Sequence, residues 1–332
     1  MWWGSQPKHC LKIGTEELVW AQMGRGWTGK RHDRCTLRRV EPGAIRVSPI
    51  EPNLVRVAEI QEQVRALVGP SQRARLFGTR SSVSIPLPIV LLLPDVCLRT
   101  AVFELDRLPR RGEEREALVR WRFGQDHLFP LTGAKVVYQA WPSGGREEQA
   151  KRNTILAAAI HEAVLEQYEA LCAACHLVPV QITTAGLQLC NLWLDSQPNP
   201  PTGALEPDVL WVSLLDRTFS ALAFQQGRLV FTRTKLLGAG EAEGLSGGNG
   251  AEAVAREVGT SLRVWQDTGQ AAREPRLVLA VPSDEPEMLR ALEEETRMPV
   301  ERLDWDLFRQ LGWTKRMQQV PLSAMPAVAG LC

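Results

Sequence analysis

The stretch VLWVSLLDRTFSALAFQQGRLVFTRT, residues 209–234, decides the fold class. Two apolar runs flank a turn at Asp216-Arg217, and a second turn at Gln226-Gly227 leads into an alternating run that begins at Arg228. Continuous apolar runs predict buried strands, and alternation of apolar and polar residues predicts a strand with one exposed face. Short turns between such runs connect antiparallel neighbours. The stretch therefore predicts a three-stranded antiparallel meander.

The elements that follow this meander repeat elements at the start of the chain. After a glycine-rich loop, 238–250, an apolar stripe predicts a helix, and a buried strand is predicted at Arg276–Val281. The stripe consists of Val254, Val258, Leu262 and Trp265. Near the N-terminus the matching strands are Cys10–Gly14, Leu18–Met23, Cys35–Val40 and Ile89–Leu93, and the matching helical stripe is Val55, Ile60, Val64 and Leu67. We therefore predict an α/β fold of two related lobes across a cleft, with the element order of the duplicated ribonuclease-H-like lobes of actin-like proteins.

A further segment interrupts the first copy. Residues 100–183 are predicted to form a small inserted α+β subdomain, with strands near Arg99–Leu105, Val136–Ala140 and Thr154–Ile160. The proline-rich stretch 198–207 is predicted to link the lobes. The expected boundaries are 1–197 for the first lobe with its insert and 208–332 for the second, with the C-terminal segment free to return to the first lobe.

Composition excludes several classes of function. The chain of 332 residues has 39 basic and 38 acidic residues, so its net charge of +1 gives no drive toward nucleic acid. Its seven cysteines are scattered, which indicates reduced thiols rather than a disulfide framework. The longest apolar run, 85–93, is too short to span a bilayer, and the first residues do not resemble a signal peptide. We expect a cytoplasmic protein with at most a peripheral contact to the inner membrane, for which the basic residues between Arg25 and Arg39 are candidates.

A series of short segments resembles the PilM family of type IV pilus assembly proteins, with GspL-type secretion proteins and FtsA-type cell-division proteins as more distant relatives. The segments are Leu92-Leu93-Pro94-Asp95, Arg99–Leu108, Arg120–Leu131, Tyr168–Pro179, Gln226–Gly238, Arg256–Trp265, Met298–Asp304 and Ala324–Leu331. Their order and spacing match over nearly the whole chain. The resemblance implies an actin-like fold and a scaffold role beneath the inner membrane, in a pilus, competence or secretion machine.

The resemblance also implies a partner. PilM-like proteins bind the cytoplasmic tail of PilN, a single-pass inner-membrane protein, and other proteins of the pilus platform are further candidates. By analogy we expect the tail to bind between the inserted subdomain and the first lobe, where Trp121, Phe123 and Phe129 are candidate contacts.

Members of the family can hold ATP between the lobes, and the resemblance implies where its phosphates would lie. The residues at these positions form two turns: Lys12, Gly14 and Thr15 in the first, and Ser213, Asp216 and Thr218 in the second. Lys12 and Ser213 stand where aspartates would hold Mg²⁺, Glu16 and Glu17 add negative charge, and the third turn, 279–282, lacks glycine. We therefore expect weak or absent binding of ATP and magnesium and no catalysis. We expect Lys12 to be a surface lysine, with a phosphate contact as the alternative.

Other functions fit the sequence less well than a scaffold does. An active ATPase or sugar kinase of the same fold is the alternative, but it needs a catalytic aspartate and intact phosphate turns. A membrane-anchored filament former needs a basic amphipathic terminus, and Val320–Cys332 carries no charge. Cys172-Ala173-Ala174-Cys175-His176 matches a haem attachment motif, but both cysteines lie on an apolar helical stripe, so we expect a packed core and no metal. Gly244–Gly250 precedes a helix without the lysine of a phosphate loop, so we expect a connector.

Overall fold

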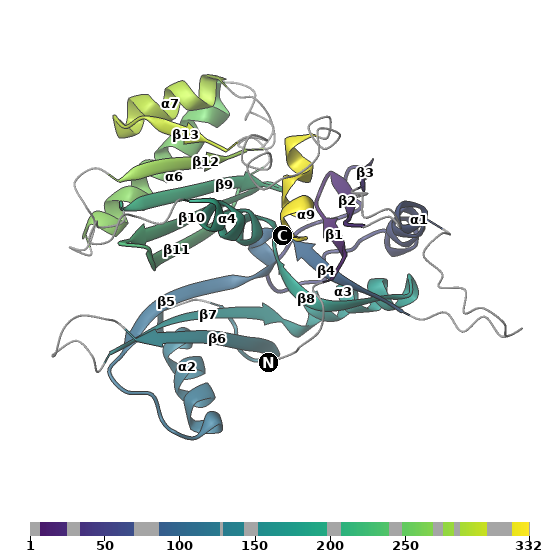
Figure 1. Ribbon diagram of the computed structural model, residues 1–332, viewed down its shortest axis with the longest axis horizontal. Coiled ribbons are helices and arrows are strands. Elements are labelled where there is room, and N and C mark those ends of the chain that lie inside the picture. The colour runs from purple at the N-terminus through teal and green to yellow at the C-terminus, as the bar shows by residue number, and fades with distance from the viewer. Residues whose placement is uncertain are drawn as a thin grey trace, which may run out of the picture.

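The computed structural model describes residues 7–24, 34–69, 86–126, 129–142, 152–197, 207–238, 248–267, 275–281, 286–303 and 321–331. Two five-stranded sheets and one three-stranded sheet form its framework (Figure 1). The predicted α/β fold with two related lobes is confirmed. Within these residues no helix is both long enough and apolar enough to cross a bilayer.

The first lobe is built on a mixed sheet with the strand order β3-β2-β1-β4-β8. Its strands are β1 (His9–Ile13), β2 (Glu17–Gln22), β3 (Arg34–Arg39), β4 (Leu87–Leu93) and β8 (Leu177–Thr184). The first three strands form the antiparallel meander, and β4 and β8 extend the sheet in parallel to β1. Parallel neighbours require crossover helices, so both faces of this sheet are covered and its central strands are mostly apolar, with Lys12 on β1 as an exception.

Helices cover both faces of the first sheet. On one face α1 (Val57–Val68) and α3 (Glu162–Ala174) bury their apolar stripes. Val55, predicted to belong to the α1 stripe, precedes the helix and is 57% exposed, because the helix begins two residues later. On the other face lie α4 (Ala185–Ser196) and the C-terminal α9 (Met325–Ala329). The C-terminal segment thus returns to the first lobe, where Gln188 donates a hydrogen bond to the carbonyl of Ala329.

The second lobe repeats this plan with the strand order β11-β10-β9-β12-β13. Its strands are β9 (Val209–Leu215), β10 (Thr218–Gln225), β11 (Arg228–Leu236), β12 (Arg276–Ala280) and β13 (Val300–Arg302). Helices α6 (Gly248–Asp267) and α7 (Pro286–Thr296) cover one face, and Trp265 of α6 is buried in the core there. The other face packs toward α4 and α9, so one apolar core joins the two lobes.

The insert is a separate layer below the lobes in Figure 1. Strands β5 (Arg99–Leu105), β7 (Asn153–His161) and β6 (Ala134–Pro142) form an antiparallel sheet in that order, and α2 (Gly112–Asp126) packs on one face. The insert therefore spans about 99–161, less than the predicted 100–183, because α3 and β8 belong to the first lobe. The predicted linker, 198–207, lies outside the described residues except for Pro207.

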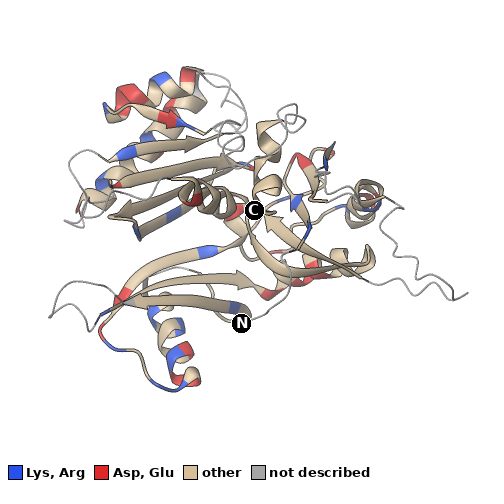
Figure 2. Ribbon diagram, viewed as in Figure 1, with Lys and Arg blue, Asp and Glu red and all other residues tan. Residues whose placement is uncertain are grey.

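Charge is distributed without a single-sign face in this view. Acidic and basic residues are interspersed along α2 and α7 (Figure 2). Such interspersed charge keeps these helix surfaces hydrated.

Candidate functional site between the lobes

The site lies where the first turn of each lobe approaches the other. In the first lobe, β1 and β2 pair up to Ile13 and Leu18, which leaves four residues for the turn. In the second lobe, β9 and β10 pair up to Leu215 and Thr218, which leaves only Asp216 and Arg217. Both residues have positive φ angles, 51° and 59°, as a two-residue hairpin turn requires, and aspartate tolerates this conformation better than most residues. The tight turn projects the Asp216 carboxylate into the first-lobe turn.

Asp216 is held there by hydrogen bonds and charge. The backbone N–H of Thr15 donates to its Oδ1 over 3.1 Å, and the Nζ of Lys12 lies 3.3 Å from its Oδ2. The Asp216 side chain is only 4% exposed. A carboxylate of the protein itself thus receives the backbone N–H that we expected to face a phosphate.

Lys12 is buried, with 2% of its side chain exposed, so the expectation of a surface lysine is wrong. Its Nζ also lies 3.2 Å from Oε1 of Glu17, whose other oxygen accepts a hydrogen bond from Ser323. Burial by itself lowers the pKa of Lys12, but the carboxylates of Asp216 and Glu17 outweigh burial and raise it above its ordinary value. The lysine survives in the core because it is paired with both carboxylates.

Asp95 makes the opposite connection, from the first lobe into the second. It lies two residues after the end of β4, in a 3-10 turn (Asp95–Cys97), and is 5% exposed. The N–H of Gly186 donates to its Oδ1 over 2.8 Å; the hydroxyls of Ser220 and Ser213 donate to its Oδ2 over 2.8 and 3.4 Å. Burial raises the pKa of Asp95, and the bonds from Gly186, Ser220 and Thr184 oppose that rise.

Sequence reasoning did not assign a site role to Asp95. The sequence did contain a signal for this role. Asp95 lies just past the end of the apolar strand β4, and sheets of this class place functional groups at the carboxyl ends of their strands. Ser213, which we predicted to lie at the second turn, is one of its partners. Thr218 is buried, and its hydroxyl caps the same turn by donating to the carbonyl of Asp216.

Two glycines allow the carboxylates to approach this closely. A Cβ on Gly14 would lie 2.0 Å from Oδ1 of Asp216, and a Cβ on Gly186 would lie 2.1 Å from Oδ2 of Asp95. Neither position tolerates a methyl group without movement of the opposite carboxylate. The glycine expected to admit a phosphate therefore admits Asp216.

Little free volume remains in this part of the cleft. The cavity lined by Asp95, Thr184, Gly186 and Ser220 has a volume of about 10 Å³, which accommodates about one water molecule. At the third turn, Leu279, Ala280 and Val281 are buried apolar residues, and Pro282 lies outside the described residues. Three carboxylates and one lysine make the site acidic on balance. Among the described residues, no three histidine, cysteine, aspartate or glutamate side chains are grouped as metal ligands.

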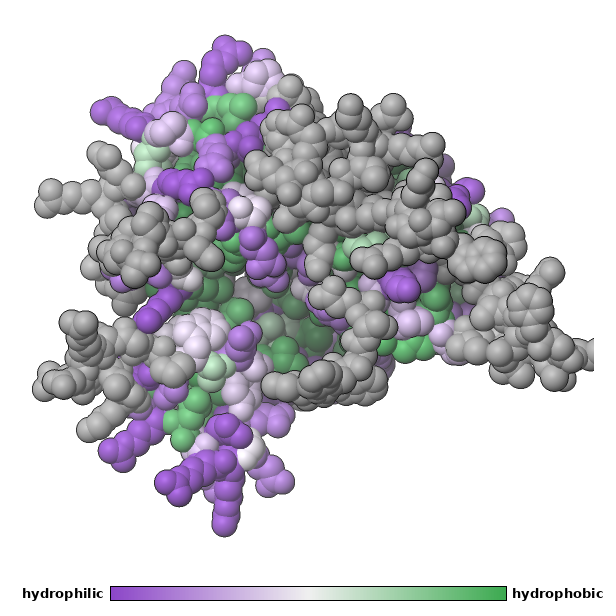
Figure 3. Space-filling view, viewed as in Figure 1, coloured by the Kyte–Doolittle hydropathy of each residue, from purple (hydrophilic) through white to green (hydrophobic). Residues whose placement is uncertain are grey.

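A larger, apolar groove opens between the insert and the lobes. Its volume is about 360 Å³. The lining residues come from three places: Gln139, Trp141 and Leu156 from the insert sheet, Leu187, Cys190, Asn191 and Leu194 from α4, and Leu222, Phe224, Gly227, Arg228 and Leu229 from the β10–β11 hairpin. In Figure 3 the molecule is hollowed here, with hydrophobic residues in the hollow. The groove therefore has a second-lobe wall in addition to the insert and first-lobe walls that we expected.

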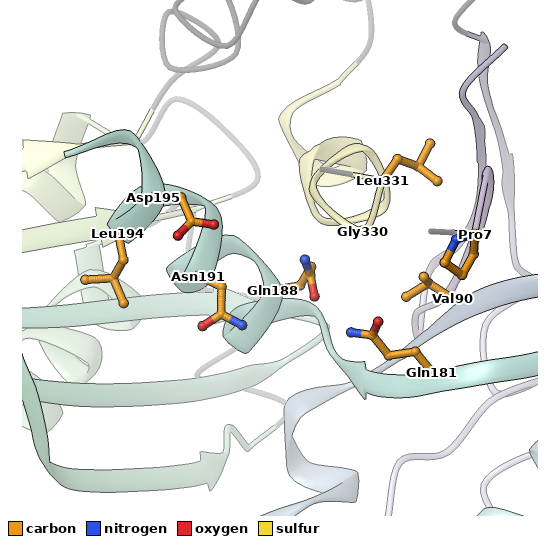
Figure 4. A pocket seen from close by; sticks show the side chains of 9 residues that line it. All are labelled: Pro7, Val90, Gln181, Gln188, Asn191, Leu194, Asp195, Gly330 and Leu331. Carbon is orange, nitrogen blue, oxygen red and sulfur yellow. The ribbon is translucent and has the colours of Figure 1, made fainter. Parts of the chain in front are cut away.

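A polar hollow of about 330 Å³ adjoins this groove along α4, and the two share Asn191 and Leu194. Figure 4 shows its carboxamide side chains, Gln181 from β8 and Gln188 and Asn191 from α4. The remainder of its lining is Pro7, Val90, Asp195, Gly330 and Leu331.

The three aromatic residues predicted as partner contacts divide into two groups. Phe123 and Phe129 are buried in the core of the insert, where they pack against the strands. That prediction is corrected for these two side chains, since they offer no surface to a partner. Trp121 is 60% exposed on α2. However, α2 covers the face of the insert sheet formed by Phe103, Ala134 and Ile155, whereas the groove contains Trp141 and Leu156 from the opposite face.

The remaining sequence motifs pack as core or fall outside the description. Cys172 and Cys175 are free and buried beside Tyr168, and burial raises the pKa of Cys172 to about 12. Their thiols are therefore protonated at neutral pH and pack as small apolar side chains. In the glycine-rich segment, residues 244–247 lie outside the described residues and Gly248–Gly250 begin α6.

Comparisons with known proteins identify the fold. No protein family model and no curated protein matches the sequence. Among solved structures, PilM of a "PilM-PilN type IV pilus biogenesis complex" matches with a TM-score of 0.68 over 98% of both chains, at 15% identity. An actin-like ATPase-fold protein of unknown function from Bacteroides thetaiotaomicron has a TM-score of 0.49 at 11% identity, over 93% of this chain and 97% of that one. The cytoplasmic domain of EpsL, from the type II secretion system of Vibrio cholerae, has a TM-score of 0.43 at 12% identity, over 87% and 94%. By its similarity to PilM along nearly its whole length, this chain has the two-lobed, actin-like fold.

Proposed function

We propose that this protein is a PilM-like cytoplasmic scaffold of a type IV pilus or a related secretion or competence machine. It binds the cytoplasmic tail of a PilN-like single-pass protein and lies at the inner membrane through that partner. The observation that carries this proposal is the whole-chain similarity in fold to PilM of a PilM–PilN complex. The further support comes from the groove and from the closed cleft.

The groove beside the insert suits an extended tail with apolar side chains. Its apolar part offers pockets formed by Trp141, Leu187 and Phe224. The adjoining carboxamides of Gln181 and Asn191 can donate and accept hydrogen bonds with a peptide main chain. Main-chain hydrogen bonds supply affinity along an extended peptide, and side-chain pockets supply specificity.

The protein is proposed to act without nucleotide hydrolysis. A nucleotide phosphate in the first turn would have to displace the Asp216 carboxylate from Thr15 and Lys12. If the carboxylate stayed about 4 Å away, repulsion would cost roughly 4 kcal/mol at an effective dielectric of 20. That corresponds to about a thousandfold in affinity. Lys12 and Ser213, at the positions expected of magnesium-binding aspartates, offer no carboxylate to a metal ion.

The partner proposal is tested by titrating the purified protein with a peptide of a PilN-like cytoplasmic tail in a calorimeter. Trp141→Ala removes the largest side chain that the insert contributes to the groove, and we expect it to weaken peptide binding at least tenfold. Trp121→Ala removes an aromatic side chain of the same size from the opposite side of the insert and serves as the matched control. Equal losses in both variants, or no binding by the unmodified protein, would contradict the proposal.

The alternative, an active ATPase or sugar kinase of the same fold, is tested separately. We expect weak or absent binding of Mg-ATP in a calorimeter and no magnesium-dependent release of phosphate. Low-micromolar binding together with phosphate release would favour the enzyme.

Membrane contact is expected to depend on the partner. Arg38 and Arg39 are exposed on the edge strand β3 and could add about 1 kcal/mol each at an anionic surface. We therefore expect weak sedimentation with vesicles of anionic phospholipid alone, and strong sedimentation when the vesicles carry the PilN-like protein. Equal sedimentation in both cases would place the membrane contact in this chain itself.

A further inference from the structure

The two buried carboxylates of the cleft form a reciprocal connection. Asp216 of the second lobe is bound by the first-lobe turn, and Asp95 of the first lobe is bound by Ser213 and Ser220 of the second lobe. We propose that these contacts form an interlobe latch that keeps the cleft closed without any ligand and fixes the spacing of the groove walls. This inference concerns the two lobes of this chain and does not depend on which partner occupies the groove.

The latch connects residues that are distant in sequence but shielded together from water. Lys12 and Asp216 are 204 positions apart, and Ser220 and Asp95 are 125 positions apart. The side chains of Lys12 and Asp216 are 2% and 4% exposed, so solvent screens their attraction much less than it would at a surface. Opening the cleft would break both sets of contacts at once.

The position of Asp95 couples the latch to the groove. Its Oδ1 accepts the N–H of Gly186 at the beginning of α4, and the next residue, Leu187, lines the groove. Its Oδ2 accepts the hydroxyl of Ser220 on β10, and Leu222 and Phe224, two and four residues further along that strand, line the opposite wall. Asp95 thus joins the ends of two walls, and its displacement would separate them.

The third wall of the groove, the insert sheet, is hydrogen-bonded to β11 of the second lobe. The guanidinium of Arg99 donates to the carbonyl of Thr234 over 3.1 Å, and the hydroxyl of Thr232 donates to the carbonyl of Thr100 over 3.0 Å. The insert therefore follows the second lobe. A change in the angle between the lobes would therefore move the α4 wall relative to the other two walls of the groove.

The latch is tested by hydrogen–deuterium exchange of the full chain, in the absence of any partner. Asp216→Gly removes the carboxylate, keeps a residue suited to the φ of 51°, and leaves Lys12 paired with Glu17. We expect at least tenfold faster exchange in the turn at Thr15 and also in peptides that cover the start of α4 and the β10–β11 hairpin. Glu114→Gln, which removes the exposed pair with Arg111, is the matched control and should change neither region.

A second variant reaches the same contact by a different route. Gly14→Ala leaves every charge in place and forces the Asp216 carboxylate away, because the added Cβ would lie 2.0 Å from it. We expect the same regions to exchange faster in this variant. In the background of Asp216→Gly, the added methyl group should have little further effect, since the group that it displaces is gone.

Two results would overturn the latch. One is faster exchange confined to the turn at Thr15, with α4 and the hairpin unchanged in both variants. The other is a full additional effect of Gly14→Ala in the Asp216→Gly background. Tail binding by the unmodified protein is a separate measurement, so failure of the latch and failure of the proposed partner can be distinguished.

Discussion

The two lobes share one strand order but differ in the length of their first turns. The first-lobe turn has four residues between the last paired positions, and the N–H of Thr15 within it donates to a carboxylate. The second-lobe turn has two residues, both with positive φ, and presents the Asp216 carboxylate. One copy has therefore kept the shape of an anion-binding turn while the other supplies the anion. A duplicated fold can thus fill its own ligand site when one copy keeps an anion-binding turn and the other copy provides the anion.

The polar residues of the two central strands also differ between the lobes. Lys12 on β1 and Ser213 on β9 both point into the cleft, and each is bound to a carboxylate of the opposite lobe. Lys12 compensates a charge, whereas Ser213 only donates a hydrogen bond. We therefore expect the loss of Lys12 to destabilise the protein more than the loss of Ser213.

The largest expected effect is that of Lys12→Met. It leaves Asp216 and Glu17 buried near each other without their cation, and loss of one partner of a buried pair typically costs about 3–5 kcal/mol. The free energy of unfolding, measured in urea, should fall by that amount. The double variant Lys12→Met/Asp216→Asn should recover part of the loss. Glu114→Gln, in an exposed pair, should change stability by less than about 1 kcal/mol. A loss of that small size for Lys12→Met would show that the pair is not buried in solution.

The next effect compares the two glycines. A Cβ on Gly186 would meet both Asp95 and Ser213, at 2.1 and 2.6 Å, inside the core that joins the lobes. On Gly14 it would meet chiefly Asp216, which lies on a turn that can move. We expect losses near the upper end of about 1–3 kcal/mol for Gly186→Ala and near the lower end for Gly14→Ala. Thermal unfolding checks the order, with Gly112→Ala as the control because its Cβ would meet nothing within 4 Å. The reverse order would mean that the first turn is the more rigid.

Asp95 predicts a dependence of stability on pH. Burial raises its pKa in the folded protein, so its ionisation destabilises the fold. Its contribution is most favourable below the ordinary aspartate pKa and is lost as pH rises through the raised value. Asp95→Asn removes this titration, so its stability relative to the unmodified protein should increase from pH 4 toward pH 8. Urea unfolding at several pH values measures the difference. A difference that stays constant would show that the environment of Asp95 does not shift its pKa.

The smallest effect compares the two serines that bind Asp95. The hydroxyl of Ser220 lies 2.8 Å from Oδ2, and that of Ser213 lies 3.4 Å from it. Loss of one hydrogen bond typically costs about 0.5–1.5 kcal/mol, and a longer bond contributes less. Ser220→Ala should therefore destabilise the protein more than Ser213→Ala, as measured by the midpoint of thermal unfolding. Equal shifts would indicate that the two hydroxyls share the carboxylate evenly.

The local pattern of the sequence predicted the duplication and most of the strands and helices, but not β8, α4 and β13. The apolar runs at Val209–Leu215 and Ile89–Leu93 and the stripe of Ile60, Val64 and Leu67 depend on side chains two to four positions apart. Local spacing is therefore sufficient to read them. The replacement of Mg²⁺-binding carboxylates by Lys12 and Ser213 is also visible in the sequence once the turns are located.

Only the tertiary structure decided what occupies the cleft. The burial of Lys12, its pairing with Asp216 and the role of Asp95 depend on residues more than a hundred positions apart that packing of the lobes brings together. The same holds for the insert, where α2 covers one face of the sheet and leaves Trp141 on the other, so Phe123 is core and the groove lies elsewhere. No local period encodes such contacts, because they arise from the fit of whole layers and not from the spacing within one strand or helix.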